Sequence, residues 1–311
     1  MTTGWQTALR GETVLITGAT GFIGRYVVER LIALGVRTFG LSRSASPETL
    51  PAGVQPLPID LRDPAAVRGA FEAAQPDRVI HLAAVGVTDP FLPVDVAVEV
   101  NIRGTVNVLE ACAAVGVRRV VHVGTAYERA AAGEPGGPGN PYVAAKLGAW
   151  SFWHAFTQAH ALNSVALRLF HVYGPRQPAR GLIPAAILSA LRGETLKMTP
   201  GEQLRDFVYV TDVVDALLAA ASTPVFLART YDIGTGEGRT VRSVVAQIFE
   251  RVGGAGRFDA GALPYRPHEV MTLIAQPEAA RRDLGWRPQI DWETGLTNTL
   301  QAYQIDRRPG E

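Results

Sequence analysis

The chain has 311 residues, and its 30 lysines and arginines nearly balance its 29 aspartates and glutamates, so the formal net charge is only +1. This balance argues against a protein that binds nucleic acid through a basic surface. The single cysteine, Cys112, excludes an internal disulfide. No apolar run reaches membrane-spanning length and the polar start is unlike a signal peptide, so we expect a soluble, cytoplasmic protein of one or two domains.

A glycine-rich segment near the start of the chain joins a predicted strand to a predicted helix. The strand covers residues 13–17, the helix covers 22–34, and Gly18, Gly21 and Gly24 lie at the turn between them. Three glycines in this context allow a tight turn, a close approach of phosphate to the backbone, and close packing of helix on strand. The N-terminus of a helix also favours negative charge. The segment therefore predicts a site for a dinucleotide pyrophosphate, with an ordinary turn that binds nothing as the alternative.

The rest of the first half alternates between apolar strands and helices. Further strands are predicted at 36–42, 55–60, 78–82, 119–125 and 164–168, and further helices at 64–74, 94–115 and 141–161. Pro64 suits a first helical turn, with Asp63 as its cap. Residues 130–139 are rich in glycine and are expected to form a loop. Nearly continuous apolar strands that alternate with helices predict an α/β fold with a doubly wound parallel Rossmann sheet.

Beyond residue 170 the pattern changes to short strands at 207–210 and 231–233, helices at 182–191, 212–221, 241–252 and 292–303, and proline-rich loops. We expect residues 1–170, with a contribution from 207–235, to form the dinucleotide-binding domain. Residues 171–206 and 236–311 are then a smaller, partly interleaved substrate-binding lobe.

The second strand bears on the choice of cofactor. Sites specific for NAD commonly carry an acidic residue there for the ribose 2′-hydroxyl, whereas arginine suits the 2′-phosphate of NADP. This strand has no acidic residue and ends with Ser42 and Arg43, which can both donate hydrogen bonds to phosphate. We therefore expect NADP, with NAD as the alternative if Arg43 is only a solvent-exposed side chain.

Three side chains downstream predict proton-transfer chemistry. Tyr142 and Lys146 are four residues apart and so share one face of a helix. An ammonium group beside a phenol lowers the pKa of the phenol, which lets it exchange a proton with a carbonyl or alcohol oxygen. Thr125 ends an apolar strand upstream and has a hydroxyl that can orient the same oxygen. A surface tyrosine–lysine pair is the alternative.

At these residues the chain resembles the extended short-chain dehydrogenase/reductase family, in particular its nucleotide-sugar epimerases, dehydratases and 4-ketoreductases. The resemblance continues, in the family's order, through residues 81–84, 101–105, 172–175, 205–213 and 284–288. It implies a catalytic set of Thr125, Tyr142 and Lys146, and no metal. The cofactor residues that it implies, together with those argued above, are Gly18, Thr20, Gly21, Phe22, Ile23, Gly24, Ser42, Arg43, Asp60, Leu61, Leu82, Ala83, Ala84, Asn101, Tyr142 and Lys146.

The same resemblance implies substrate contacts at Thr88, Thr125, His171, Arg205 and Arg266. His171 stands where the family often has asparagine, so it either hydrogen-bonds the sugar or diphosphate or is a neutral core histidine. Arg205 and Arg266 are similar to the arginines that bind the diphosphate in relatives, with surface arginines as the alternative. The helices at 94–115 and 141–161 resemble those that form a four-helix interface in relatives, which implies a homodimer.

The two residues after Thr125 narrow the choice of reaction. Dehydratases of the family have acidic residues directly after this threonine, whereas this chain has Ala126 and Tyr127. The leading interpretation is an NADPH-dependent 4-ketoreductase acting on a nucleoside-diphosphate 4-keto-6-deoxyhexose, with dTDP as the expected nucleotide. The alternatives are an NAD-dependent sugar-nucleotide 4-epimerase and a non-catalytic protein that senses the dinucleotide.

Overall fold

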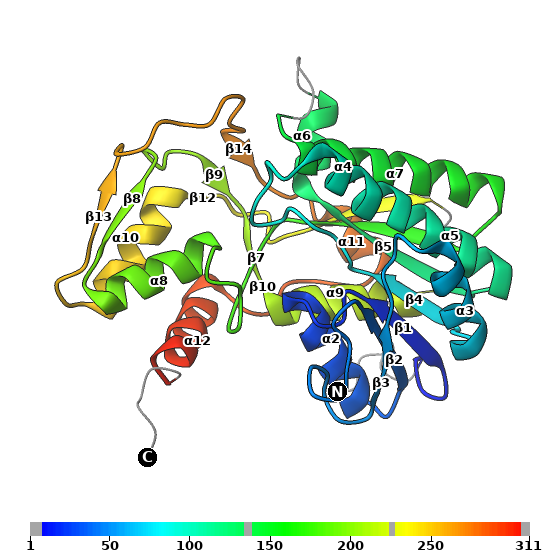
Figure 1. Ribbon diagram of the computed structural model, residues 1–311. Coiled ribbons are helices and arrows are strands. Elements are labelled where there is room, and N and C mark those ends of the chain that lie inside the picture. Colours follow the sequence, from blue (N-terminus) through cyan, green and yellow to red (C-terminus); the bar gives the residue numbers. More distant parts are fainter. Residues whose placement is uncertain (1–7, 134–138, 224–227, 306–311) are drawn as a thin grey trace.

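The fold was analysed in a computed structural model that describes residues 8–133, 139–223 and 228–305 (Figure 1). Its centre is one seven-stranded, wholly parallel sheet with the order β11-β6-β5-β4-β1-β2-β3. The strands are β1 (Thr13–Thr17), β2 (Arg37–Ser42), β3 (Val54–Pro58), β4 (Arg78–His81), β5 (Arg119–Thr125), β6 (Ser164–Leu169) and β11 (Arg229–Ile233). The predicted doubly wound α/β fold is confirmed.

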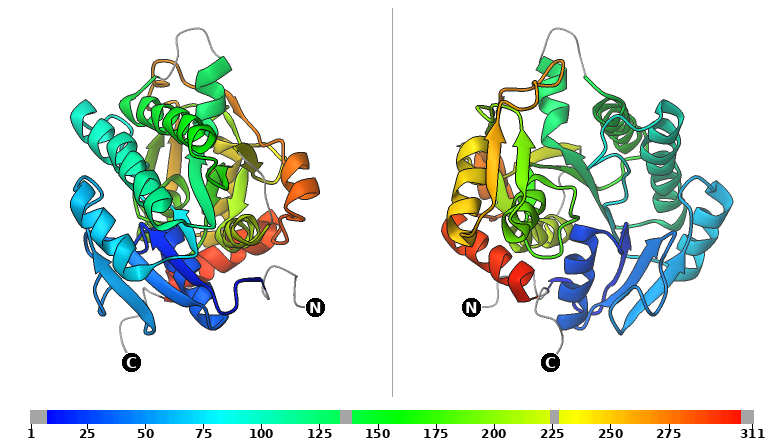
Figure 2. Two further views of the ribbon diagram at one scale, coloured as in Figure 1. Left: turned by 90° about the vertical axis from the view of Figure 1, so that its right-hand side faces the viewer. Right: turned by 60° about the vertical axis from the view of Figure 1, so that its left-hand side comes forward.

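Alternating side chains of these strands fill two hydrophobic cores, one on each face of the sheet. Leu15 of β1 packs with α3 (Pro64–Ala74), α5 (Gly104–Val115) and α7 (Pro141–Ala159). Its neighbours in β1 pack on the other face with α2 (Phe22–Ala33), α9 (Val210–Ser222) and α11 (Glu278–Asp283). Figure 2 shows the two helical layers on either side of the sheet. Asp63 caps α3 as expected, because its carboxylate accepts from the backbone N–H of Ala65 and Ala66.

In the first half of the chain, two predicted segments have a different secondary structure in the fold. The helix expected at 94–115 is divided into α4 (Val94–Ala97), a π-helical segment η1 (Val98–Arg103) and α5. The wide turn coincides with a hydrogen bond of 2.6 Å from the Thr105 hydroxyl to the Asn101 carbonyl, and periodicity does not reveal such a turn. Part of the expected loop at 130–139 was also wrong, because α6 (Ala126–Gly133) is helical. Residues 134–138 lie outside the described residues.

The remaining elements gather beyond the carboxyl ends of the sheet strands (Figure 1). One core joins α8 (Leu182–Arg192), α10 (Val241–Val252) and α12 (Trp292–Ile305) to β8 (Thr195–Met198) and β13 (Arg257–Ala260). Short strands connect this group to the sheet, namely β7 (His171–Tyr173), β9 (Leu204–Arg205), β10 (Phe207–Tyr209), β12 (Arg239–Thr240) and β14 (Thr272–Leu273). Strand β11 belongs to the large sheet although it lies beyond residue 207 in the chain. Helix α9, from the same part of the chain, packs on one face of that sheet. The division into two domains stays a prediction.

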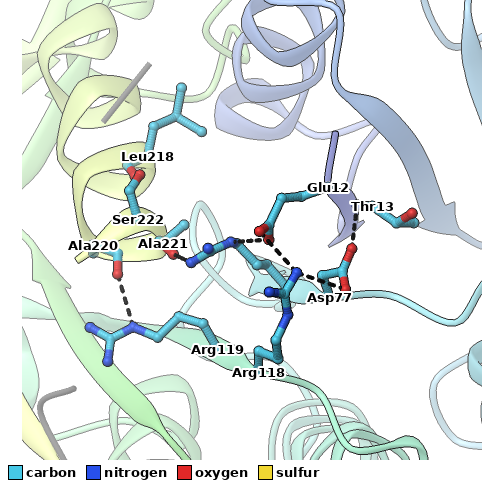
Figure 3. A network of polar contacts seen from close by, with 10 residues as sticks. Glu12, Thr13, Asp77, Arg118, Arg119, Leu218, Ala220, Ala221 and Ser222 are labelled. Atoms are coloured by element: carbon cyan, nitrogen blue, oxygen red, sulfur yellow. Dashed lines mark hydrogen bonds and ion pairs between the residues drawn. The ribbon is translucent and has the colours of Figure 1, made fainter. Parts of the chain in front are cut away.

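The opposite end of the sheet is closed by a network of arginines (Figure 3). Arg118 forms ion pairs of 2.9 Å with both Glu12 and Asp77. Arg119 is fully buried and donates through Nε to the carbonyl of Ala220, at 3.0 Å. This carbonyl lies in the last turn of α9, where a cation is favourable to the helix dipole. The network therefore stabilises the end of the sheet that faces away from the cavity at its carboxyl edge.

Candidate active site

A cavity of about 790 Å³ lies at the carboxyl ends of β1, β4, β5 and β6, between the sheet and the C-terminal elements. Open parallel sheets bind ligands at this edge. Among the predicted site residues, those that line the cavity are Gly18, Gly21, Phe22, Ile23, Gly24, Leu82, Ala84, Thr88, Thr125, Tyr142, Lys146, His171 and Arg266. Those that do not line it are Thr20, Ser42, Arg43, Asp60, Leu61, Ala83, Asn101 and Arg205.

The glycine-rich turn has the geometry of a phosphate cradle. Gly18 has φ +71°, which side chains rarely adopt, and its N–H donates to the carbonyl of Leu41. A Cβ at Gly24 would lie 2.2 Å from the Gly18 oxygen, so only glycine lets α2 pack this close to β1. No side chain caps the N-terminus of α2 at Gly21. Its first N–H groups therefore remain available to an anion at the cavity wall, and the turn fits a dinucleotide pyrophosphate.

Around the end of β2, hydroxyl groups and arginines lie together. The Thr20 hydroxyl donates to Ser42 Oγ at 3.0 Å and lies 3.2 Å from Ser44 Oγ. Arg43 is exposed, and its positive charge helps to lower the pKa of Asp60. The main cause of that lowered pKa is the hydrogen bonding of Asp60 with Arg62, whose Nη2 lies 2.7 Å from Asp60 Oδ2. Asp60 is thus already paired with Arg62. The groups next to Arg43 that can hydrogen-bond a ligand are the hydroxyls of Ser42 and Ser44.

The three predicted catalytic side chains converge on the cavity. Asn140 accepts from the Val143 N–H and so caps the start of α7 two residues before Tyr142. One helical turn later, Lys146 donates through Nζ to the Val123 carbonyl at 2.6 Å. The Thr125 side chain lies beside the Tyr142 phenol at the cavity wall. The structure therefore brings together three residues from the end of β5 and the first two turns of α7.

The electrostatics of Tyr142 correct one expectation. We expected Lys146 to lower the pKa of the phenol. Instead, burial first and then the charge of Glu128 raise the pKa of Tyr142, while the Thr125 side chain lowers it. Burial also lowers the pKa of Lys146, which Glu128 partly restores. Tyr142 is consequently a neutral phenol at physiological pH, which is the protonation state of a proton donor.

Behind the cavity wall, a buried chain of hydrogen bonds supports the loop after β4. His81 lies 2.7 Å from the Thr17 hydroxyl through Nδ1 and 3.0 Å from the Thr105 hydroxyl through Nε2. The side chain of Asn101 exchanges two hydrogen bonds with the backbone of Val85, at 2.9 and 3.0 Å. Asn101 therefore acts on the cavity through Val85, whose neighbours Ala84 and Gly86 line the cavity.

Of the predicted substrate residues, Arg266 and His171 line the cavity, whereas Arg205 is buried and does not line it. Arg266 lines the cavity with its guanidinium carbon 5.6 Å from the ring centre of Phe91. Arg205 is buried, and its Nη2 lies 2.6 Å from Oε1 of Glu269, a residue that lines the cavity. His171 also lines the cavity, and burial lowers its pKa to about 3, so it is neutral.

Three residues of the site escaped the sequence analysis as functional candidates. Tyr127 and Glu269 line the cavity, and the charge of Arg205 acts on the Tyr127 phenol to lower its pKa, against the larger effect of burial. Glu128 lies beneath Thr125 with no solvent exposure. A threonine followed three residues later by a glutamate is the sequence pattern of a helix capping box. This pattern could have pointed to Glu128 from the sequence alone. Within the described residues, no group of three or more histidine, cysteine or acidic side chains is placed to hold a metal ion, and no helix is long and apolar enough to cross a bilayer.

A parallel sheet with an uncapped glycine turn and a Thr-Tyr-Lys set at its carboxyl edge defines a nicotinamide-dinucleotide-dependent enzyme of the short-chain dehydrogenase/reductase type. The chain belongs to the NAD-dependent epimerase/dehydratase family, whose model matches residues 14–234.

Similar proteins act on nucleotide sugars. A UDP-glucose 4-epimerase of Mycolicibacterium smegmatis is 31% identical, and the match covers 93% of this chain and 98% of that protein. A dTDP-6-deoxy-L-talose 4-dehydrogenase (NAD(P)(+)) of Kitasatospora kifunensis is 32% identical over 89% of this chain and 91% of that protein. The crystal structure of a Thermus thermophilus UDP-glucose 4-epimerase in complex with NAD superposes with a TM-score of 0.82 at 32% identity, covering 94% of this chain and 99% of that one.

Proposed function

We propose that the protein is an NADPH-dependent 4-ketoreductase that acts on a nucleoside-diphosphate 4-keto-6-deoxyhexose, with dTDP as the expected nucleotide. The observation that carries the proposal is the buried Tyr142 phenol beside Thr125 at the wall of the cavity, whose raised pKa keeps it neutral. Reduction of a ketone needs a proton donor at the oxygen, and a phenol with a raised pKa is in the donating form. The similarity to a dTDP-sugar 4-dehydrogenase supports the same chemistry.

Bound NADPH would supply a hydride to the carbonyl carbon of the substrate. Tyr142 would give its phenolic proton to the carbonyl oxygen, which leaves an alcohol on the sugar and a phenolate on the protein. Thr125 would orient that oxygen through its hydroxyl. Lys146 would stabilise the phenolate until a proton from solvent restores the phenol.

The choice of NADPH is supported by the groups around the end of β2. Arg43 is exposed there, and the hydroxyl of Thr20 lies within hydrogen-bonding distance of the hydroxyls of Ser42 and Ser44. A 2′-phosphate would accept from several of these donors, because three oxygens of a phosphate can each take more than one hydrogen bond. NAD carries only a neutral 2′-hydroxyl in this place, which can accept a hydrogen bond from an arginine but forms no ion pair with it.

The diphosphate of the substrate would lie toward Arg266, with Arg205 holding Glu269 in place from behind. His171 would present a neutral imidazole to the sugar or diphosphate. Binding energy from this remote part of the substrate would fix the sugar carbonyl against Tyr142. Thr88, also at the cavity wall, is proposed as a further substrate contact.

The second candidate function is a sugar-nucleotide 4-epimerase that retains NAD, and it is favoured by the two similar UDP-glucose 4-epimerases. One experiment separates the two functions. The protein is incubated with NADPH or NADH and a dTDP-4-keto-6-deoxyhexose, and separately with UDP-glucose, and sugar products and nicotinamide absorbance are followed. Stoichiometric loss of NADPH with the keto sugar supports the reductase. Conversion of UDP-glucose to UDP-galactose without net loss of cofactor would replace it by the epimerase.

We also propose a homodimer through α4, η1 and α7. These adjacent helices expose the apolar side chains of Val94, Val98 and Phe152, of which Val94 is 65% and Phe152 is 53% exposed. A four-helix interface with a second copy would cover them. A monomer in light scattering at micromolar concentration would contradict the dimer.

A further inference from the structure

Gln177 lines the cavity beyond β7, but the proposed reaction gives it no part. A hydrogen bond of 3.1 Å from Nε2 to the carbonyl of Val172 fixes the orientation of its side-chain amide, since only the nitrogen can donate. Its Oε1 is buried and has no hydrogen-bond partner among the described residues. A buried acceptor of this kind is costly unless a donor binds to it.

The amide of Gln177 lies at the cavity wall. Its two neighbours, Val172 and Gly181, both line the cavity. A Cβ at position 181 would lie 3.0 Å from Nε2 and 3.3 Å from Cδ of Gln177. Glycine at position 181 therefore leaves the room that the amide occupies beside the cavity.

The backbone around Gln177 is strained and is held from two helices. Arg176 has φ +63°, which residues other than glycine rarely adopt. The Tyr26 hydroxyl of α2 donates to the Pro175 carbonyl at 2.9 Å, and the Tyr303 hydroxyl of α12 donates to the Gln177 carbonyl at 2.7 Å. Backbone strain persists only where the surroundings enforce it, and it gathers at ligand-binding sites.

Arg176 also contacts α2 directly. Its two terminal nitrogens lie 2.6 and 2.8 Å from the two carboxylate oxygens of Glu29, and its guanidinium carbon lies 4.2 Å from the ring centre of Tyr26. Bidentate pairs of this kind fix a geometry as well as a distance. Because α2 begins at the glycine-rich turn, this contact fixes Gln177 relative to the proposed cofactor site.

We propose that Gln177 binds a ligand through Oε1, which accepts a hydrogen bond from a hydroxyl or amide group, and that Arg176 is the positioning residue that holds Gln177 for this contact. Phosphate oxygens only accept hydrogen bonds at these positions, so the donor belongs to a neutral part of a ligand. Its two sources are the ribose or nicotinamide amide of NADPH and the hexose of the sugar nucleotide. The identity of these two ligands rests on the proposed function.

Gln177→Met tests the contact, because methionine keeps the length of the side chain and removes its hydrogen-bonding groups. Fluorescence titration measures the dissociation constant of NADPH. Calorimetry on the protein saturated with NADP⁺, which cannot reduce a ketone, measures those of a dTDP-4-keto-6-deoxyhexose and of UDP-glucose. Gln177→Met should weaken NADPH or the sugar nucleotides by about two- to tenfold, the loss of one neutral hydrogen bond, and the ligand affected identifies the donor. Unchanged dissociation constants for all three would overturn the proposal.

The matched control is Gln203→Met. Gln203 is also buried, its Oε1 has no partner among the described residues, and its Nε2 makes one hydrogen bond, to Thr199. It does not line the cavity. Gln203→Met should keep the wild-type affinities, and equal losses in the two variants would overturn the proposal.

The role of Arg176 is tested by a double-mutant cycle. Arg176→Ala should weaken the same ligand as Gln177→Met does, but should add nothing in the Gln177→Met background, because it acts through Gln177. Additive losses would overturn the positioning role. Arg176→Lys should recover part of the affinity, since an ammonium can still pair with Glu29 but not in bidentate fashion.

Arg30→Ala is the control for Arg176→Ala. Arg30 lies on α2, forms an ion pair of 3.6 Å with Asp215, and is 44% exposed, as is Arg176. Arg30→Ala should leave all three affinities unchanged. If Gln177→Met does not fold, wild-type affinities in Arg176→Ala would overturn the proposal. Failure of the proposed function is a separate result, since the wild type would then consume no NADPH with the keto sugar, whereas these titrations need no turnover.

Discussion

Gly24→Ala tests the phosphate cradle, because the structure defines how much room is missing. The new Cβ would lie 2.2 Å from the Gly18 oxygen and 2.9 Å from the Ala19 Cα, whereas carbon contacts favour about 3.5–4.0 Å. Both neighbours are backbone atoms, so no rotamer relieves the clash, and α2 has to move away from β1. Overpacking of this kind costs about 1–3 kcal/mol.

The matched control is Gly69→Ala in α3. Gly69 is also helical, but nothing lies within 4 Å of its Cβ position. Alanine should therefore stabilise the protein there by about 1 kcal/mol, through helix propensity alone. Both variants gain the same helix propensity, so urea unfolding should separate them by the overpacking cost alone, about 1–3 kcal/mol of unfolding free energy, and fluorescence titration should show weaker NADPH binding only for Gly24→Ala. Equal stability of the two variants, with NADPH affinity unchanged in both, would refute the reasoning.

Three further results are expected. Tyr142→Phe should lower kcat by about 10²–10⁴-fold, as loss of a general acid does, with cofactor affinity nearly intact; full activity in that variant would remove Tyr142 from the mechanism. Arg43→Ala should weaken NADPH about ten- to a hundredfold, the loss of one charge-assisted hydrogen bond, and leave NADH little changed; equal losses for both would contradict the NADP assignment. Burial lowers the pKa of His81 to about 3 and that of His122 well below 6.5, so the unfolded chain binds these protons first as pH falls. Stability should then decrease below about pH 6.5 by about 1.4 kcal/mol per pH unit for each histidine. In His122→Leu the free energy of unfolding, measured in urea, should fall less steeply with decreasing pH, by about 1.4 kcal/mol per pH unit. An unchanged slope would contradict the claim that His122 is neutral in the folded protein.

The sheet was predictable because its strands carry their own signal. The strands are continuous apolar runs bounded by turns, and burial on both faces requires that pattern. The glycine spacing likewise predicted a turn that the structure builds with Gly18 at positive φ. The π-helical segment at 98–103 was not predictable, since no residue type interrupts the helical pattern there.

The site was predictable only where a motif stands close together in the chain. Tyr142 and Lys146 are one helical turn apart, so their proximity follows from spacing. The contact of Arg205 with Glu269 joins segments more than sixty residues apart, and no local pattern specifies it. The electrostatics of Tyr142 were missed for a related reason. Spacing indicated the nearby lysine, whereas the dominant influences are burial and a glutamate beneath the threonine.

The position of β11 in the chain has a consequence for synthesis on the ribosome. Strand β6 ends at Leu169, and its outer neighbour in the sheet is β11, which begins at Arg229. Until the chain has been made past Ile233, β6 presents an unpaired edge, and until it has been made past Ser222, Val165 and Leu167 on its face also lack the cover of α9. An apolar strand with free backbone groups readily pairs with another chain. A released chain that ends between Leu169 and Arg229 therefore exposes the unpaired edge of β6, and this edge finds its partner only after about three-quarters of the protein has been translated.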